Sequence, residues 1–267
     1  MTLPRNRFKA WLKEPPARPP LGSWLMAASP VTAEAMGWAG FDFLVLDMEH
    51  VPVDIPQALA LMQAVAGTPA EIVVRLPWND PVIVKRVLDV GAQSLMFPFV
   101  QNAAEAAAAV AATRYPPAGI RGVAAMHRAA RYGMVGDYLH KAQEEIAVIL
   151  QLETSAAVAA LPRIAEVAGV DAVFTGPADL SASMGRLGGI GEPDVQQALR
   201  DALGEAHRLG LPCGIVGGTP DLVRSYLGAG FDFVALGSDL ALMMGAARGA
   251  LSAVRGDESP AAATGAY

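Results

Sequence analysis

Gly40-Phe41-Asp42-Phe43-Leu44-Val45-Leu46-Asp47 contains a pattern that returns twice farther along the chain. In each copy a glycine precedes a hydrophobic residue, an aspartate and an apolar run. The other two copies are Gly169-Val170-Asp171-Ala172-Val173-Phe174 and Gly230-Phe231-Asp232-Phe233-Val234-Ala235-Leu236. Glycine at this place suits the left-handed residue that ends a helix. The pattern therefore predicts a repeated unit in which a helix ends and a buried strand begins.

Apolar runs of strand length recur along the whole chain. Those expected to form strands are residues 21–27, 43–47, 71–75, 94–98, 147–152, 172–175, 213–216 and 233–236. Helical patterns fall between them, notably at 55–66, 81–90, 103–114, 156–168, 195–209 and 221–229. This alternation predicts an α/β fold, a single (β/α)8 TIM barrel. A doubly wound sheet is the alternative, but the first strand lacks the glycine-rich turn of a dinucleotide-binding unit.

The chain divides into a long central domain with two short flanks. We expect residues 1–20, which are basic and rich in proline, to be an N-terminal extension. Residues 21–255 form the predicted barrel domain, and residues 256–267 a flexible tail of small and polar residues. The longest interval between predicted strands, residues 99–146, exceeds what one helix needs, which predicts a functional connection that folds over the mouth of the barrel.

Composition limits the classes of partner. The 267 residues are 53% hydrophobic and carry a formal charge of −6. An acidic chain with no block of Lys or Arg argues against nucleic-acid binding and favours a small-molecule partner. Cys213 is the only cysteine, which excludes an intramolecular disulfide and fits a reducing compartment. No secretory signal and no membrane span is recognisable, so we expect a cytoplasmic protein.

Chargeable side chains gather where the predicted strands end. They are Asp47, Glu49 and His50 after the second strand, Arg75 at the third, Gln151 and Glu153 at the fifth, and Asp179 after the sixth. Barrel enzymes keep catalysis at this C-terminal edge. Glu153 and Asp179 are oxygen ligands suited to Mg²⁺ or Mn²⁺, and two carboxylates leave positions open for water and substrate. The alternative is that both residues only cap the helices that follow.

Two further side chains have candidate catalytic roles. His50 could move protons near neutral pH, with Asp89, near the end of the third predicted helix, as its carboxylate partner. Arg75 places a permanent cation where an anion or a developing enolate could rest. A structural salt bridge between Arg75 and Asp47 or Glu49 is the alternative.

Longer motifs carry a resemblance to a known family. They are Asp47-Met48-Glu49-His50, Trp78-Asn79-Asp80-Pro81, Leu88-Asp89-Val90-Gly91, Arg114-Tyr115-Pro116-Pro117-Ala118-Gly119-Ile120-Arg121-Gly122 and Gly176-Pro177-Ala178-Asp179-Leu180-Ser181. Together these motifs resemble the HpcH/HpaI aldolase family of metal-dependent pyruvate aldolases, over about residues 21–254. The resemblance implies a TIM barrel, commonly assembled as a hexamer with an exchanged C-terminal helix.

The resemblance also implies a reaction and roles for individual residues. A 4-hydroxy-2-oxo acid would be cleaved to an aldehyde and pyruvate, or a related donor such as hydroxypyruvate, through an enolate. Glu153 and Asp179 would bind Mg²⁺, Mn²⁺ or Co²⁺, and His50 paired with Asp89 would transfer protons. The remaining implied contacts are Arg75 with the keto oxygen, Gln151 in the pocket wall, the backbone of Gly176, Pro177, Ala178 and Asp179 with the carboxylate, and Val216 in the aldehyde pocket.

Two positions depart from the family's pattern. Met48 stands where members usually have glycine, and His127 lies in a region that they fill with small or apolar residues. We expect Met48 to narrow or reshape the pocket. Aldehyde preference is therefore the property that transfers least from the family.

Three rival functions were weighed. A Schiff-base aldolase needs a lysine at the end of a strand, and none of Lys9, Lys13, Lys85 and Lys141 is so placed. A CoA-ester lyase of the related citrate-lyase-β-like branch would share the barrel and the acidic site. A nonenzymatic metabolite-binding barrel would keep the fold without turnover.

Overall fold

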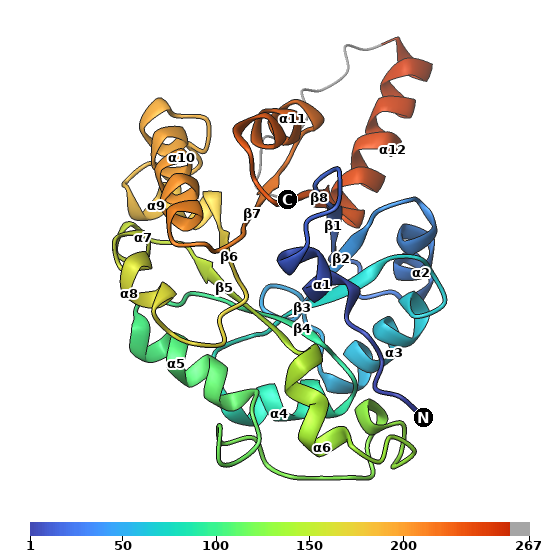
Figure 1. The fold of residues 1–267 in the computed structure, drawn as a ribbon. Coiled ribbons are helices and arrows are strands. Elements are labelled where there is room, and N and C mark those ends of the chain that lie inside the picture. Colours follow the sequence, from blue (N-terminus) through green and yellow to red (C-terminus); the bar gives the residue numbers. More distant parts are fainter. Residues whose placement is uncertain (257–267) are drawn as a thin grey trace.

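A computed structural model describes residues 1–256, in which eight parallel strands close into one barrel in sequential order (Figure 1). The strands are β1 (Leu21–Leu25), β2 (Phe43–Asp47), β3 (Glu71–Arg75), β4 (Ser94–Phe97), β5 (Ala147–Leu152), β6 (Ala172–Thr175), β7 (Cys213–Gly217) and β8 (Phe233–Ser238). The predicted TIM barrel is confirmed, and each predicted strand agrees with the structure to within two residues at either end.

Helices surround the barrel and follow the strands in turn. They are α1 (Arg7–Lys13), α2 (Pro30–Trp38), α3 (Ile55–Val65), α4 (Pro81–Asp89), α5 (Ala103–Ala112), α6 (Tyr138–Lys141), α7 (Ser155–Ala159), α8 (Leu161–Ala165), α9 (Pro177–Ser183), α10 (Pro193–Arg208), α11 (Pro220–Ala229) and α12 (Asp239–Arg255), with 3₁₀ turns η1 (Arg128–Ala130) and η2 (Ala142–Glu145). The helix predicted at 156–168 is divided into α7 and α8, because Pro162 lacks the N–H that a continuous helix needs.

The glycine and aspartate pattern has a structural cause. All three glycines adopt a left-handed φ, +102° at Gly40, +99° at Gly169 and +102° at Gly230. Each aspartate then accepts a hydrogen bond from a backbone amide of the preceding strand: Asp42 from Leu21 at 2.9 Å, Asp171 from Val148 at 2.9 Å, and Asp232 from Cys213 at 2.7 Å. The glycine turns the chain out of a helix, and the aspartate fastens the next strand to its neighbour.

Aromatic side chains fill the barrel interior. Phe43, Phe174, Phe233 and Trp24 are all buried there. Phe8 of α1 packs against them, with ring centroids 5.2 Å from Phe43 and 5.3 Å from Phe233. Phe43 and Phe233 begin their strands, so α1 closes the N-terminal end of the barrel. We call this end the base and the C-terminal end the mouth.

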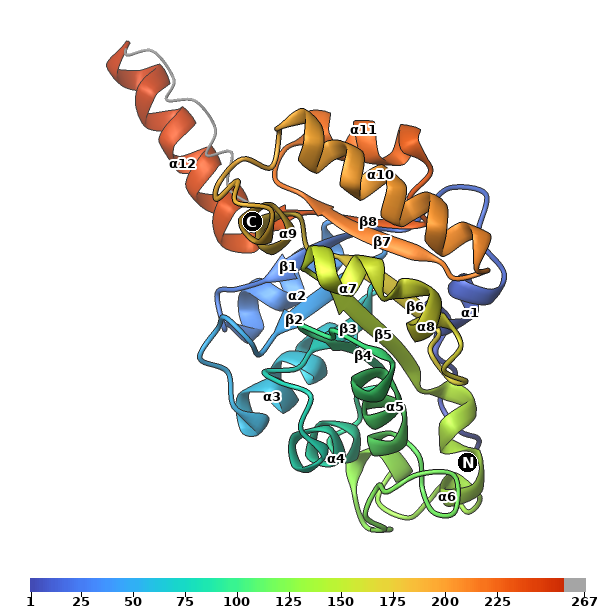
Figure 2. The ribbon, with the colours of Figure 1, turned by 90° about the vertical axis from the view of Figure 1, so that its left-hand side faces the viewer.

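The long connection between α5 and β5 lies at the base, so the prediction that it folds over the mouth is wrong. In a TIM barrel the helices run opposite to the strands. Residues 113–146 connect the C-terminal end of α5 to the first residue of β5. Both of these points lie at the base. Figure 2 shows α6, which is part of this connection, beside the N-terminus.

Helix α12 projects away from the barrel in both views (Figures 1 and 2). At its first residue the Asp239 carboxylate accepts hydrogen bonds from the amides of Met26 at 2.8 Å and Ala27 at 3.2 Å. The predicted tail lies outside the described residues, apart from Gly256. Among residues 1–256, no helix combines the length and the hydropathy needed to cross a bilayer.

Candidate active site

A buried arginine lies at the centre of the mouth. The Arg75 side chain is fully buried, with Nε 2.9 Å from Asp47 Oδ1 and Nη2 2.7 Å from Asp47 Oδ2. Its Nη1 lies 3.0 Å from Glu49 Oε2, and its guanidinium carbon lies 4.2 Å from the Trp24 ring centroid. Arg75 and Asp47 are paired in register as the last residues of β3 and β2. The salt bridge weighed as an alternative is present, and it holds a permanent cation at the mouth.

Glu153 is a second buried carboxylate near Arg75, after Asp47. It is 2% exposed, its Oε1 accepts a hydrogen bond from Gln151 Nε2, and its Oε2 accepts one from the Phe99 amide at 3.1 Å. The carboxylate lies over Gly176, where a Cβ would stand 2.6 Å from Glu153 Oε1. Only glycine at 176 leaves room for the carboxylate in this position.

Negatively charged side chains outnumber positively charged ones around Glu153. The pKa of Glu153 is raised to about 8, chiefly by burial and also by the nearby charges of Glu49 and Asp179, while Arg75 and the Phe99 amide oppose the rise. Burial also raises the pKa of Glu49, and Arg75 opposes that effect. Several carboxylates therefore share one buried guanidinium. A divalent cation beside Glu153 would relieve this crowding of negative charge.

The donor set fits such a cation. Gln151 Oε1 is buried and has no hydrogen-bond partner among residues 1–256. Within the same part of the chain no three His, Cys, Asp or Glu side chains gather around one point. A metal would therefore rest on two carboxylates, and the remaining positions would be filled by oxygen atoms of water or substrate.

Asp179 lies in the first turn of α9 and is exposed. The helix caps nearby are other residues: Thr154 Oγ1 caps α7 through the Ala157 amide at 3.0 Å, and Gly176 is the N-cap of α9. The alternative that Glu153 and Asp179 serve only as caps is therefore wrong.

His50 and Asp89 do not meet within this chain. His50 follows β2 at the mouth, with a side chain 54% exposed and its Nε2 4.0 Å from Glu49 Oε2. Asp89 ends α4 at the base, where its Oδ1 lies 2.8 Å from Arg121 Nη2 and 3.7 Å from His127 Nε2. The length of the barrel separates the two residues. His127 is therefore at the base too, away from any pocket at the mouth.

The other predicted positions lie in distinct surroundings. Pro177 and Ala178 begin α9 beside Gly176. Val216 is 2% exposed within the barrel interior. Met48 is 6% exposed and packs with the hydrophobic side chains between barrel and helices, so its effect on the pocket stays a prediction. Strand-like alternation explains this packing, because Asp47 and Glu49 face Arg75 and the residue between them faces away.

Phe99 is a site residue that the sequence did not reveal. Its φ is +53°, which is unusual for a residue with a side chain. In this conformation the Phe99 backbone amide donates its hydrogen bond to Glu153. Its ring stacks on Trp78 with centroids 6.2 Å apart, and both rings are largely exposed. A backbone donor has no signature in side-chain chemistry, and an apolar residue after a strand predicts only packing.

Comparisons with known proteins agree on one family. The model of the HpcH/HpaI aldolase/citrate lyase family matches residues 21–246. A 2-dehydro-3,6-dideoxy-6-sulfogluconate aldolase from Pseudomonas putida is 50% identical, over 93% of this chain and 97% of its own. A 4-hydroxy-2-oxo-heptane-1,7-dioate aldolase from Klebsiella pneumoniae is 49% identical, over 92% and 91%. The crystal structure of a family protein from Burkholderia cenocepacia superposes with a TM-score of 0.90 at 42% identity, over 94% of this chain and 99% of its own.

Proposed function

The chain belongs to the HpcH/HpaI aldolase/citrate lyase family, and from that premise we propose that it cleaves 4-hydroxy-2-oxo acids reversibly to an aldehyde and a 2-oxo acid. Pyruvate is the proposed 2-oxo product, with hydroxypyruvate as a related donor. The relatives at 49–50% identity are named aldolases, which favours aldol cleavage over the cleavage of CoA esters. Their names differ in the far part of the substrate, so the aldehyde is left open.

The observation that carries the proposal is that the buried Glu153 carboxylate lies at one mouth with the buried Arg75 guanidinium and within reach of the charges of Glu49 and Asp179. We propose that Glu153 and Asp179 hold a divalent metal, Mg²⁺, Mn²⁺ or Co²⁺, with Gln151 beside it. When bound, the metal would supply a Lewis acid for the oxygens of the 2-oxo acid. The amides at the start of α9, which no side chain caps, would receive the substrate carboxylate.

Arg75 would stabilise negative charge during cleavage, and His50 would transfer a proton. Cleavage of the C3–C4 bond leaves negative charge on the 2-oxo oxygen, and the permanent charge of Arg75 would stabilise it. His50 would take the proton of the 4-hydroxyl group, because its exposed ring can reach a substrate at the mouth. Asp47 and Glu49 would keep Arg75 in place through their ion pairs.

We also propose that the active form is an oligomer, a hexamer as is common in the family. Helix α12 leaves apolar side chains exposed, including Leu242, Met243, Met244, Leu251 and Val254. A second copy covering this helix would remove them from water. The proposed pairing of His50 with Asp89 also needs a second copy, since the two residues occupy opposite ends of one barrel.

The test is exchange of the C3 protons of pyruvate and hydroxypyruvate for deuterium, followed by NMR with Mg²⁺ or Mn²⁺ and then with chelator. Enolisation requires no knowledge of the aldehyde. We expect metal-dependent exchange that Asp179→Ala reduces at least about 100-fold. Asp201→Ala, which removes an exposed carboxylate on α10, should leave it unchanged. Full exchange by Asp179→Ala would refute the metal assignment, and no exchange with either donor would refute the aldolase proposal.

A further inference from the structure

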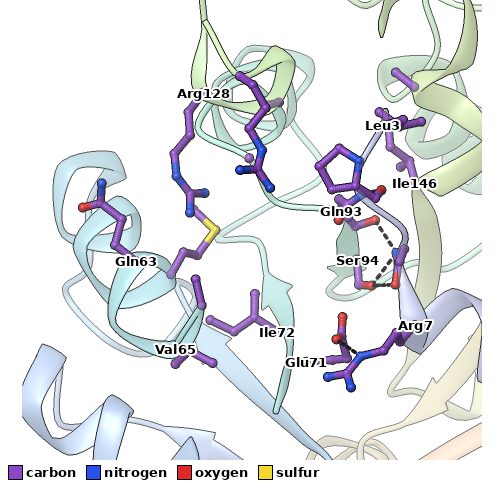
Figure 3. A pocket seen from close by; sticks show the side chains of 18 of the residues that line it. Leu3, Arg7, Gln63, Val65, Glu71, Ile72, Gln93, Ser94, Arg128 and Ile146 are labelled. Atoms are coloured by element: carbon purple, nitrogen blue, oxygen red, sulfur yellow. Dashed lines mark hydrogen bonds and ion pairs between the residues drawn. The ribbon is translucent and has the colours of Figure 1, made fainter. Parts of the chain in front are cut away.

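A cavity lies at the base, away from the carboxylates of the mouth. Its volume is about 690 Å³, within the range of small-molecule sites. Its walls combine the N-terminal segment, the end of α3, the start of β3 and the connection between α5 and β5 (Figure 3). Neither Glu153 nor Arg75 lines it. The proposed aldolase reaction therefore gives this space no role.

The floor of the cavity is polar and fully bonded. Asn6, 2% exposed, donates from Nδ2 to Ser94 Oγ at 3.0 Å and to the Gln93 carbonyl at 3.2 Å. Gln93 Nε2 donates to the Pro4 carbonyl at 2.7 Å. These hydrogen bonds join the N-terminal segment to β4, so the floor of the cavity is fixed and hydrophilic.

Arginines dominate the charge around this floor. The charged residues of the lining are Arg7, Arg128, Arg131 and Glu71. Arg7 is paired with Glu71 across a 2.5 Å contact from Nε to Oε1. Arg128 donates from Nη1 to the Val90 carbonyl at 2.9 Å, and Arg131 makes no side-chain hydrogen bond or ion pair with any part of residues 1–256. Two positive charges therefore lack a carboxylate partner in the described chain.

These two arginines act on each other unfavourably. Burial lowers the pKa of Arg128, the charge of Arg131 lowers it further, and Tyr132 opposes both. Arg131 and Tyr132 are also consecutive residues in the left-handed region, with φ of +50° and +54°. Backbone of this kind persists where the surroundings enforce it and often accompanies binding sites. An anion between the two guanidinium groups would convert their repulsion into two attractions.

We propose that this cavity binds a small organic anion, recognised through a phosphate or carboxylate group by Arg128 and Arg131. Guanidinium groups match both kinds of oxyanion through paired N–H donors. The polar floor formed by Asn6, Gln93 and Ser94 would face the hydroxyl groups of such a molecule. The site is independent of the aldolase chemistry, because no residue of the mouth takes part.

The test is calorimetric titration of the full chain with inorganic phosphate and, separately, with citrate, at low ionic strength and with EDTA to remove metal from the mouth. We expect at least one probe to bind, and the Arg128→Gln, Arg131→Gln double variant to bind it at least about tenfold more weakly. Binding of phosphate alone would assign a phosphate ester, and binding of citrate alone a carboxylate.

Controls separate a built site from general attraction of anions. Arg163→Gln with Arg224→Gln removes two arginines that are 77% and 70% exposed in surface ion pairs, and it should leave the affinity unchanged. Arg131→Gln alone guards against misfolding of the double variant, since the Arg131 side chain makes no hydrogen bond or ion pair in the described chain. Failure of both probes to bind, or equal weakening in the surface pair, would overturn the proposal.

Discussion

The mouth and the base of the barrel both hold ion pairs, but they differ in burial. At the mouth the side chains of Arg75 and Asp47 are 0% exposed. At the base the side chains of Arg7 and Glu71 are 49% and 21% exposed. Water screens the second pair and not the first, so the same chemical contact has different energetic weight at the two ends. Burial, rather than the end of the barrel alone, sets this weight, since Arg121 beside Asp89 at the base is also 0% exposed.

The largest expected effect is that of Arg75→Ala. It leaves the buried Asp47 carboxylate without its partner, which should lower the free energy of unfolding by about 3–5 kcal/mol. Urea denaturation measures the change. Arg163→Ala, which removes an exposed arginine, should change the free energy by less than about 1 kcal/mol. Equal shifts for the two variants would end the distinction between buried and exposed ion pairs.

The next effect is a dependence of stability on pH that originates at Glu153. Its folded pKa of about 8 lies above the ordinary value of 4.5, so the folded state holds a proton that the unfolded state releases between these values. The stabilisation that Glu153 gives the metal-free protein should therefore be complete below about pH 4.5 and be lost as pH rises through 8, by on the order of 5 kcal/mol in total. Urea denaturation with chelator from pH 5 to 9 measures this. In Glu153→Gln the slope should be smaller, and an unchanged slope would contradict the assignment.

A smaller effect is expected from Gly176→Ala. The new Cβ would meet Glu153 Oε1 at 2.6 Å and displace the carboxylate, so Mn²⁺ affinity measured by calorimetry should fall about tenfold or more. The matched control is Gly204→Ala in α10, where a Cβ meets nothing within 4 Å. That variant should bind Mn²⁺ normally and gain slightly in stability. Normal Mn²⁺ binding by Gly176→Ala would show that the Glu153 carboxylate can move away from the new Cβ without loss of metal affinity.

The smallest effect is expected at the base. Arg7→Ala breaks an ion pair in contact with water, so the free energy of unfolding should fall by no more than about 1 kcal/mol. Thermal and urea denaturation should agree on this value. A loss as large as that of Arg75→Ala would mean that the base is as strongly coupled as the mouth, and the comparison would fail.

Much of the barrel could be predicted because its signals are local. Strands β2, β3, β5 and β6 have the predicted bounds to the residue, since each is a short, largely apolar run with polar residues at or just after its end. The clustering of Arg75 and Glu153 followed from the same rule, that parallel strands end at one edge. Helix α1 was missed because its burial depends on Phe8 reaching rings far along the chain.

Predictions based on residue type or segment length alone did not consider which end of the barrel each residue lies at. The pairing of Asp89 with His50 took no account of the end of the barrel: Asp89 ends α4 at the base, so the pairing stays a prediction that needs a second copy. The long connection was predicted to fold over the mouth because of its length. It leads into β5, however, and β5 begins at the base, so the connection lies at the base as well. The Phe99 amide could not have been found, because its role depends on a left-handed turn.

The N-terminal helix has a consequence for the order of synthesis. Asn6 bonds to Gln93 and Ser94, and Lys9 Nζ bonds to the Ile146 carbonyl at 2.6 Å and lies 3.3 Å from Asp171 Oδ1. A growing chain makes residues 6–9 long before it makes these partners. The helix cannot form these contacts until Ile146 and Asp171 have left the ribosome. Closure of the base therefore waits for residues that are made well over a hundred positions after the helix itself.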